Sequence, residues 1–352
     1  MNKIDLYIWA NDYSSNTGEG RLARNFISFL QKKYPRSIIK IKTPEKEFII
    51  ENSQIEKRYI TQKNNFFYKY LVFLYGIFYL WSKRNNKIVY INYLPLWNFF
   101  IFLLLPKKTI LGPITGGVNV EKINNLENFI RIFLFPVLYK VSLFIINIKF
   151  SKVLFSTNLL EKYTNIKNKN SFFFGYIYNL FLTKAPLINK NKIYDLIFYN
   201  RNYNSKKSYL VKSIILDLPK KVKVCVVGDK CEGKCFINKG YVSHQLALKL
   251  ISQSKLAFGS SENLLSLFAV DCYNSGVKLI YDKNTLKNNI VSRKNSLAIN
   301  YKNSSKSSKS ILKEIKKYKF KKDLKYIKFL KKKKYKFTIF LKKFFKENSQ
   351  YK

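Results

Sequence analysis

Four polar side chains in the second half of the sequence could bind a diphosphate and the sugar attached to it. Arg201 and Lys206 stand five positions apart, directly after an apolar run. An arginine offers phosphate a planar fork of N–H groups, whereas a lysine offers a point charge. Glu262 and Asp271, with eight residues between them, provide carboxylates that can accept hydrogen bonds from sugar hydroxyls.

The two carboxylates lie in a stretch, residues 259–282, that predicts a βαβ unit. A short apolar run leads into Ser-Ser-Glu, ending at Glu262, which is the usual chemistry of a helix N-cap. The apolar residues that follow share one helical face: Leu264, Leu267, Phe268 and Cys272. Gly276 ends this pattern, and 277–281 is predicted as the next strand. Glu262 is therefore expected at the carboxyl end of a strand, beside helix N–H groups suited to a phosphate, although an ordinary buried unit with a capping glutamate fits as well.

This order of residues resembles the C-terminal site of the group 1 glycosyltransferases, which have the two-domain GT-B fold. In that family a serine, a first acid, a helix with a second acid, and then Gly-Val and a strand hold the sugar nucleotide. The matching residues here are Ser260, Ser261, Glu262, Asp271, Gly276 and Val277. The sequence departs from the family by leaving eight residues between the acids instead of seven, and by having Asp as the second acid. We place the extra residue within 263–270.

The resemblance implies a role for each side chain. Glu262 would lie by the donor sugar and Asp271 would bind the ribose hydroxyls. Arg201 and Lys206 would contact the donor diphosphate, because the family has an arginine and a lysine at the same interval. The remaining expected donor-binding residues of this half are Asn263, Leu264 and His244. A solvated helix cap is the alternative for His244.

A glycine-rich loop is predicted between a first strand at 4–9 and a helix from about 21 to 34. Gly18 and Gly20 in this loop would let the backbone approach a ligand closely. In the family such a loop lines the cleft near the donor phosphate and the acceptor, so both glycines are expected donor-binding residues; a flexible turn is the alternative. A second glycine-rich loop at 112–117 has the same two interpretations.

Repeated alternation of strands and helices predicts an α/β protein with doubly wound parallel sheets. Further strands are predicted at 37–42, 87–92, 109–111, 152–156, 194–199 and 223–227. With the resemblance, this pattern indicates the GT-B fold, in which two Rossmann-like domains face each other across a cleft. We expect an acceptor-side domain at 1–178, a sugar-nucleotide-binding domain at 179–305 and a basic amphipathic tail at 306–352.

The chain is strongly basic, with 66 Lys and Arg against 20 Asp and Glu, a net charge of +46. This charge favours an acidic partner such as nucleic acid or an anionic membrane. Part of it also follows from A/T-rich codons, which encode Lys together with Asn, Ile, Phe and Tyr. The lysines are spread along the whole chain and no recognised nucleic-acid motif is present, so we expect no nucleic-acid partner.

Apolar and aromatic residues gather at 66–81, 94–105 and 129–148. The first two segments are shorter than the ~20 apolar residues of a transmembrane helix, and the third is interrupted by Arg131, Pro136 and Lys140. In the tail, apolar residues recur among lysines at helical spacing: Tyr326, Ile327, Leu330, Phe337, Phe340, Leu341 and Phe344. Such a helix is expected to bind an anionic membrane surface, with the first two apolar segments adding shallow contacts. Packing of the tail across the two domains is the alternative.

The first residues predict a strand and not a signal peptide. We therefore expect a cytoplasmic protein, peripheral at the inner face of the membrane, with its four cysteines reduced. Cys231, Cys235 and His244 are poorly spaced for zinc and lack a fourth ligand, so no metal site is expected.

These observations predict a glycosyltransferase that moves a sugar from a nucleotide-sugar donor to a lipid-linked or cell-envelope glycan, with retention as the resemblance implies. The nucleotide sugar is a co-substrate, and neither a further cofactor nor a metal is expected, because protein cations neutralise the departing diphosphate. Two alternatives stay open: a basic nucleic-acid- or membrane-binding protein with a Rossmann-like core, and a transferase-fold protein without activity.

Overall fold

The computed structural model describes residues 5–14, 17–51, 54–59, 66–115, 129–156, 160, 172–174, 189, 191–201, 208–259, 264, 266–285, 295–318 and 324–347. The chain divides into two compact units, each built on its own sheet. The first comprises Met1–Thr183 with Lys333–Lys352, and the second comprises Lys184–Lys332. The domain boundary expected after residue 178 lies outside the described residues, and the expected start of the tail at 306 falls within helix α10 (Ser304–Lys316).

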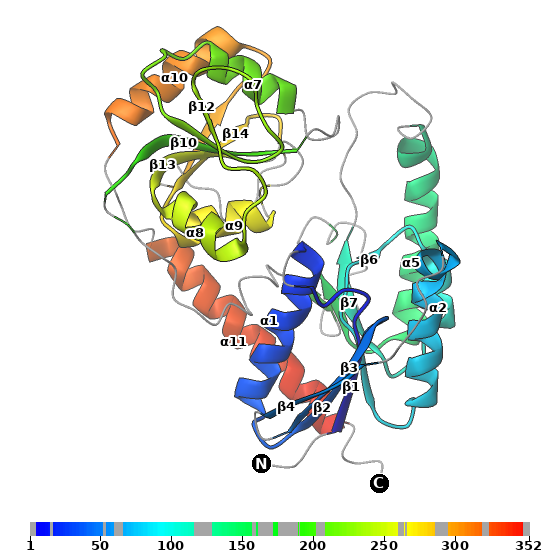
Figure 1. Ribbon diagram of the computed structural model, residues 1–352. Coiled ribbons are helices and arrows are strands. Elements are labelled where there is room, and N and C mark those ends of the chain that lie inside the picture. Colours follow the sequence, from blue (N-terminus) through cyan, green and yellow to red (C-terminus); the bar gives the residue numbers. More distant parts are fainter. Residues whose placement is uncertain are drawn as a thin grey trace. The chain divides into compact units, whose positions relative to one another are not determined.

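The first unit contains a mixed nine-stranded sheet in the order β4-β3-β2-β1-β5-β7-β8-β9, with β6 beside β7 (Figure 1). Its strands are β1 (Asp5–Trp9), β2 (Ile38–Lys42), β3 (Lys46–Glu51), β4 (Gln54–Tyr59), β5 (Lys87–Tyr90), β6 (Leu94–Pro95), β7 (Ile110–Thr115), β8 (Val153–Phe155) and β9 (Phe172–Phe174). β1 pairs in parallel with β2 on one side and with β5 on the other. The antiparallel hairpin of β3 and β4 was not expected, because helices were predicted between the strands at 37–42 and 87–92.

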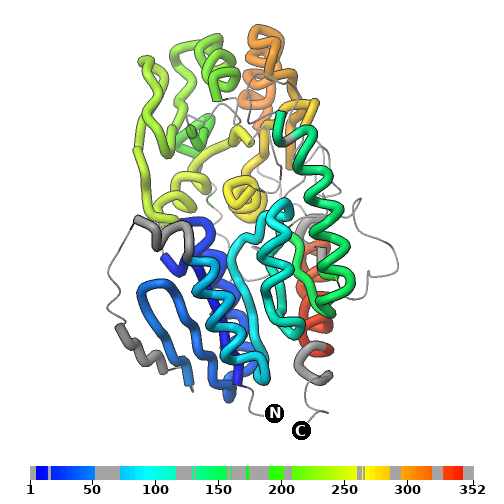
Figure 2. Tube along the Cα trace, turned by 90° about the vertical axis from the view of Figure 1, so that its right-hand side faces the viewer, coloured from blue at the N-terminus to red at the C-terminus, as the bar shows by residue number. Residues whose placement is uncertain are grey.

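The helices of the first unit are α1 (Gly18–Lys33), α2 (Phe66–Ser82), α3 (Phe99–Leu104), α5 (Phe135–Lys149) and the π-helical turn η1 (Ile130–Leu134). α2, α3 and α5 lie side by side (Figure 2), and their inner faces cover a core that includes Trp9, Tyr90, Phe102 and Phe155. α2 approaches β1 closely at Gly76, where a Cβ atom would stand 2.3 Å from Nε1 of Trp9. Only glycine fits there without moving the indole.

Pro136 interrupts the apolar run at 129–148 but not the helical structure that contains it. Proline lacks the N–H that would bond the carbonyl four residues earlier. Pro136 occupies the first turn of α5, where that N–H is not needed, and η1 continues the helical chain directly before it. By length and composition, Ile132–Lys149 qualifies as a membrane-spanning helix, with 22% of its residues buried.

The second unit has a parallel six-stranded sheet in the order β12-β11-β10-β13-β14-β15, the doubly wound arrangement predicted from the sequence. Its strands are β10 (Tyr194–Asn200), β11 (Val224–Gly228), β12 (Phe236–Asn238), β13 (Ser254–Phe258), β14 (Lys278–Asp282) and β15 (Ser296–Ile299). Helices α7 (Ser208–Leu216) and α10 cover one face, and α8 (His244–Ser252) and α9 (Leu267–Asn274) cover the other (Figure 1). The short runs of Val, Ile, Leu and Phe in β10, β11 and β13 are nearly all buried, as expected for strands covered on both faces.

The last helix, α11 (Leu324–Glu347), carries the amphipathic pattern of the predicted tail, but part of its apolar stripe is buried inside the protein. Phe337, Phe340 and Leu341 are buried, and the ring of Phe337 packs on Phe29 of α1 and on Phe173 of β9. These three side chains are therefore buried within the first unit and are not available to lipid, whereas the alternative for the tail was packing across both domains.

Candidate functional site

The strand order of the second sheet makes the carboxyl ends of β10 and β13 the candidate site for a ligand. From β10 the chain winds first to β11 and β12 on one side and then crosses to β13, β14 and β15 on the other. In doubly wound sheets, ligands bind in the crevice outside the strands at this change of direction. Arg201 directly follows β10 and Gly259 directly follows β13, so both belong to this edge of the sheet.

Hydrogen bonds hold the turn that follows β11 against the end of β10, next to Arg201. The main-chain oxygen of Asn200 accepts the N–H of Asp229 at 3.1 Å, and the Asn200 side chain donates to the Asp229 oxygen at 2.9 Å. Gly228 between them has φ +96°, and a Cβ atom there would lie 2.3 Å from the Asn200 oxygen. Glycine is required at 228 both for the backbone conformation and for the close approach. The ends of β10 and β11 are thereby held together.

Exposed aromatic and charged side chains surround this junction. Nε of Arg201 donates to the Tyr199 hydroxyl at 3.1 Å, and the guanidinium lies over the Tyr199 ring, 5.3 Å from its centroid. Tyr241 donates its hydroxyl to Asp229, and Tyr199 also contacts Phe268 of α9, with ring centroids 5.8 Å apart. Arg201 is therefore oriented by an aromatic ring while its guanidinium stays exposed to a ligand.

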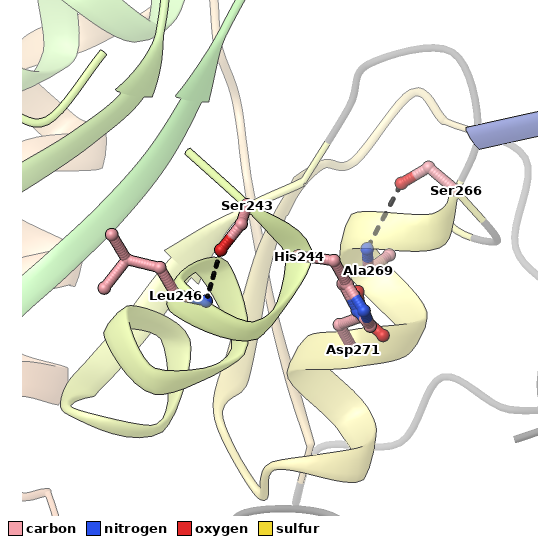
Figure 3. Close-up of polar contacts among 6 residues, drawn as sticks. All are labelled: Ser243, His244, Leu246, Ser266, Ala269 and Asp271. Carbon is pink, nitrogen blue, oxygen red and sulfur yellow. Dashed lines mark hydrogen bonds and ion pairs between the residues drawn. The ribbon is translucent and has the colours of Figure 1, made fainter. Parts of the chain in front are cut away.

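His244, the first residue of α8, meets Asp271 in the second turn of α9 (Figure 3). Nε2 of His244 lies 3.3 Å from Oδ2 of Asp271. The Asp271 side chain is 5% exposed and that of His244 is 29% exposed, so the imidazole is the more accessible member of the pair. The N-cap of α8 is Ser243, whose hydroxyl accepts the Leu246 N–H; His244 is thus the first helical residue and not the solvated cap considered as an alternative.

α9 begins later than predicted. Its N-cap is Ser266, whose hydroxyl accepts the Ala269 N–H at 3.2 Å, so the Ser-Ser-Glu sequence does not cap this helix. Leu264 is buried but precedes α9, and the predicted helical face therefore begins at Leu267. Three predicted site residues, Lys206, Glu262 and Asn263, lie outside the described residues.

Gly18 and Gly20 lie within α1 and not in a loop before it, because the helix starts earlier than predicted. Thr17 is the N-cap, and its hydroxyl accepts the Gly20 N–H at 3.0 Å. A Cβ atom at 20 would lie 2.2 Å from the backbone oxygen of Ser14, so the packing of the preceding loop requires glycine there. In the second glycine-rich stretch, Gly112 belongs to β7, whereas Gly116 and Gly117 lie outside the described residues.

The first unit has a polar cluster that the sequence analysis missed. Asp12 follows β1 and Asn92 follows the neighbouring β5; the Asn92 side chain donates to the Asp12 backbone oxygen at 3.1 Å. Glu19, in the first turn of α1, is close to both. The pKa of Glu19 is raised to about 7, chiefly by burial and also by the charge of Asp12, while a hydrogen bond from Asn92 opposes the shift. Polar residues directly after two adjacent parallel strands were the signal that could have revealed this cluster.

The edge of the second sheet can bind a phosphorylated ligand by charge and aromatic contact. Arg201 provides a phosphate donor, Tyr241 an exposed ring, and His244 with Asp271 a polar pair for hydroxyl groups. Among the residues that the structure describes, no group of three or more His, Cys, Asp or Glu side chains is placed to hold a metal ion.

Solved structures of glycosyltransferases are similar to this chain along most of its length. The pneumococcal O-GlcNAc transferase GtfA, in complex with UDP and GlcNAc, aligns over 99% of both chains with a TM-score of 0.57 and 10% identity. HepE of Anabaena, in complex with UDP-glucose, aligns over 89% of this chain and 90% of its own with a TM-score of 0.52 and 10% identity. TarM of S. aureus, in complex with UDP among other ligands, aligns over 77% of this chain with a TM-score of 0.50 and 14% identity, and the chain spans 55% of TarM.

These similar structures define the class of fold. They are GT-B glycosyltransferases, and the chain has the same fold, in the form that resembles the group 1 glycosyltransferases. No protein-family model matches the sequence, and no curated protein matches it either. Structural similarity thus confirms the predicted GT-B fold, although these proteins are only 10–14% identical in sequence to this chain.

Proposed function

We propose that this protein is a glycosyltransferase that takes a sugar from a nucleotide-sugar donor and transfers it, with retention, to a lipid-linked or cell-envelope glycan. The observation that carries the proposal is the polar edge at the change of direction in the second sheet, where Arg201 and the His244–Asp271 pair lie within a GT-B fold. Structures of GtfA and HepE contain UDP with GlcNAc or UDP-glucose. UDP-glucose and UDP-GlcNAc are therefore the first donors to test.

We propose that different residues at this edge bind different parts of the donor. Arg201 would pair with the diphosphate, together with Lys206. The side chain of Asp271 is one methylene shorter than the glutamate that the group 1 glycosyltransferases have as their second acid, and it already contacts His244. The more exposed imidazole of His244 would therefore share the ribose hydroxyls with the Asp271 carboxylate.

The reaction itself requires mainly positioning and charge. The donor must be held, the departing diphosphate neutralised and the acceptor hydroxyl placed against the anomeric carbon. Arg201 and Lys206 would supply the positive charge and Glu262 would bind the donor sugar. The proposal therefore includes no metal and no cofactor beyond the nucleotide sugar.

Thermal unfolding with and without sugar nucleotides tests donor binding. A ligand at 100 times its dissociation constant stabilises the native state by about 2.7 kcal/mol, so one of the UDP-sugars should raise the Tm by several degrees. If no sugar nucleotide raises the Tm, the proposed function is wrong. Binding without hydrolysis or transfer of the bound sugar would instead identify a transferase fold that lacks activity.

Arg201→Ala is expected to weaken donor binding by about 1.5–3 kcal/mol, because a charge-assisted hydrogen bond to phosphate is lost. Lys206→Ala should act in the same direction. Lys221→Ala is the matched control: Lys221 is exposed and precedes β11, at the opposite edge of the same sheet. Titration calorimetry with the donor measures the affinities. If both the Arg201 and Lys206 variants bind the donor with the affinity of the parent, the diphosphate does not bind at this edge.

Glu262→Gln is expected to leave the Tm unchanged and to lower turnover by about tenfold or more, equivalent to about 1.4 kcal/mol of transition-state stabilisation. The amide keeps the size of the side chain but loses the charge that would orient the donor sugar. Steady-state transfer rates measure the effect. Turnover at the parent rate would show that the match between this stretch and the family motif is a coincidence or is out of register.

A further inference from the structure

The helices beside the first sheet carry a large exposed apolar surface. We call it the apolar helix face and define it by Phe78 of α2, Phe100 and Leu103 of α3, Phe133 of η1, and Phe144 and Ile148 of α5. These side chains are 51% to 71% exposed. α3 contacts both α2 and α5, and the three helices lie side by side (Figure 2), so we treat these exposed residues as one apolar face of the first unit.

α5 shows most clearly that this exposure is not ordinary. Its inner stripe, Tyr139, Leu143 and Ile146, is buried in the core of the first unit. Its opposite side carries a second apolar stripe, Val137, Val141, Phe144 and Ile148, which is exposed along about three turns. A surface helix normally presents polar residues to water on that side. The outer stripe of α5 therefore has the composition of a buried face.

The carboxyl-terminal ends of the three helices are fastened together. Nε1 of Trp81, at the end of α2, donates to the Leu104 oxygen of α3 at 2.7 Å. Nζ of Lys149, at the end of α5, donates to the Leu103 oxygen. These bonds join the helices at one end and fix the apolar helix face as a single surface.

Cations border this fastened end. Arg84 lies over the Trp81 ring, 5.8 Å from its centroid, and Lys107 and Lys108 are exposed directly after α3. Burial lowers the pKa of Lys149, and the nearby charge of Lys107 lowers it further. The sequence contains no Asp or Glu between Glu56 and Glu121, and none between Glu127 and Glu161. No carboxylate of these segments offsets the positive border.

We propose that the apolar helix face docks on the surface of an anionic phospholipid bilayer. Its apolar side chains would enter the boundary between headgroups and acyl chains, while Arg84 and the lysines would meet lipid phosphates. Trp81 and Trp97, both about 40% exposed, have the amphipathic rings that favour this depth. A second copy of the chain fits less well, because two chains with a net charge of +46 each repel one another.

The docking is peripheral. Ile132–Lys149 is long and apolar enough to span a membrane, but Leu143 and Ile146 of the same helix are 5% and 0% exposed in the core. Ser142 is completely buried beside them. To cross a bilayer, α5 would have to leave this core and expose the strands beneath it. Lying in the interface requires no such change.

Sedimentation of the full-length protein with vesicles tests the proposal. The parent should sediment with vesicles of phosphatidylcholine and phosphatidylglycerol and much less with phosphatidylcholine alone. The double variant Phe144→Glu, Ile148→Glu should lose at least about tenfold in vesicle affinity, because a carboxylate is costly near the acyl chains and is repelled by anionic headgroups. Leu216→Glu is the matched control, since Leu216 is 59% exposed on α7 of the second unit.

Two further measurements keep the outcomes separate. A tail variant with Lys331→Gln, Lys332→Gln and Lys334→Gln should keep most of the vesicle affinity. In the parent, brominated lipids should quench part of the tryptophan fluorescence, because Trp9 is buried while the other two tryptophans are exposed. Parent-like sedimentation of the double variant, loss of binding in the tail variant alone, or no quenching in the parent would overturn the proposal. So would a dimer in solution that the double variant abolishes.

This inference does not rest on the proposed transferase reaction. Phe144 and Ile148 belong to the first unit, whereas the proposed donor residues belong to the second. The double variant should therefore bind a UDP-sugar as the parent does. If the double variant loses vesicle binding, the docking face is supported whether or not a UDP-sugar binds. If the parent binds a UDP-sugar but the double variant sediments like the parent, the donor site is supported and the docking face is not.

Discussion

Replacing Phe337 with alanine is expected to lower the free energy of unfolding by about 3–5 kcal/mol, because the change removes a buried aromatic ring and leaves a cavity. The side chain is 0% exposed. Its ring centroid lies 5.6 Å from that of Phe29 in α1 and 4.9 Å from that of Phe173 in β9. Denaturant unfolding followed by circular dichroism measures the loss.

Tyr335→Ala is the matched control for this change. Tyr335 lies on the same helix but is 69% exposed, so its removal should alter stability by no more than about 0.5 kcal/mol. If Phe337→Ala unfolds like the control, the packing of α11 on the first unit is wrong. The apolar stripe of α11 would then be free to serve as the membrane anchor expected from the sequence.

Glu19→Gln is expected to stabilise the protein above about pH 7 by about 3 kcal/mol. The folded pKa of Glu19, about 7, lies above its ordinary value of 4.5, so the folded state holds a proton that the unfolded state releases. The contribution of Glu19 to the free energy of unfolding is therefore largest below pH 4.5. This contribution is lost as the pH rises through the folded pKa of about 7. Each unit of pKa difference corresponds to about 1.4 kcal/mol.

The pH dependence distinguishes this effect from a simple change in packing. Unfolding free energies of parent and Glu19→Gln should converge near pH 4.5 and diverge between there and pH 7. Glu45→Gln, which removes an exposed carboxylate of the same unit, is the matched control for the loss of one negative charge. A constant difference between parent and Glu19→Gln across this range would show that the carboxyl does not titrate as its burial implies.

Local patterns in the sequence were sufficient for several of the parallel strands, although β9, β12 and β15 were not predicted. β1, β2, β10 and β11 are short apolar runs followed by loop residues, and their predicted limits agree with the structure to within two residues. The two sheets follow from this alternation, whereas the GT-B fold was expected because residues 259–282 resemble the group 1 glycosyltransferases. Arg201 could be placed from the same pattern, because a residue directly after a central strand has only one edge of the sheet to occupy.

The start of α9 was misplaced because three serines could each cap the helix: Ser260, Ser261 and Ser266 have the same chemistry. The other two misses came from contacts between residues that are distant in the sequence. Glu19 meets Asn92, which follows β5, and His244 meets Asp271 because α8 and α9 pack against each other. Such contacts leave no local signature in the sequence.

The two segments that build the first unit set the order in which it can be completed during translation. Residues 1–183 form most of the unit, yet residues 333–352 belong to it as well. While the ribosome is still making the second unit, Phe29 and Phe173 lack the ring of Phe337 that covers them. Until residues 333–352 have been made, the nascent segment 1–183 therefore has an exposed aromatic surface, which favours chaperone binding or aggregation. Production of residues 1–183 alone would make that temporary state permanent.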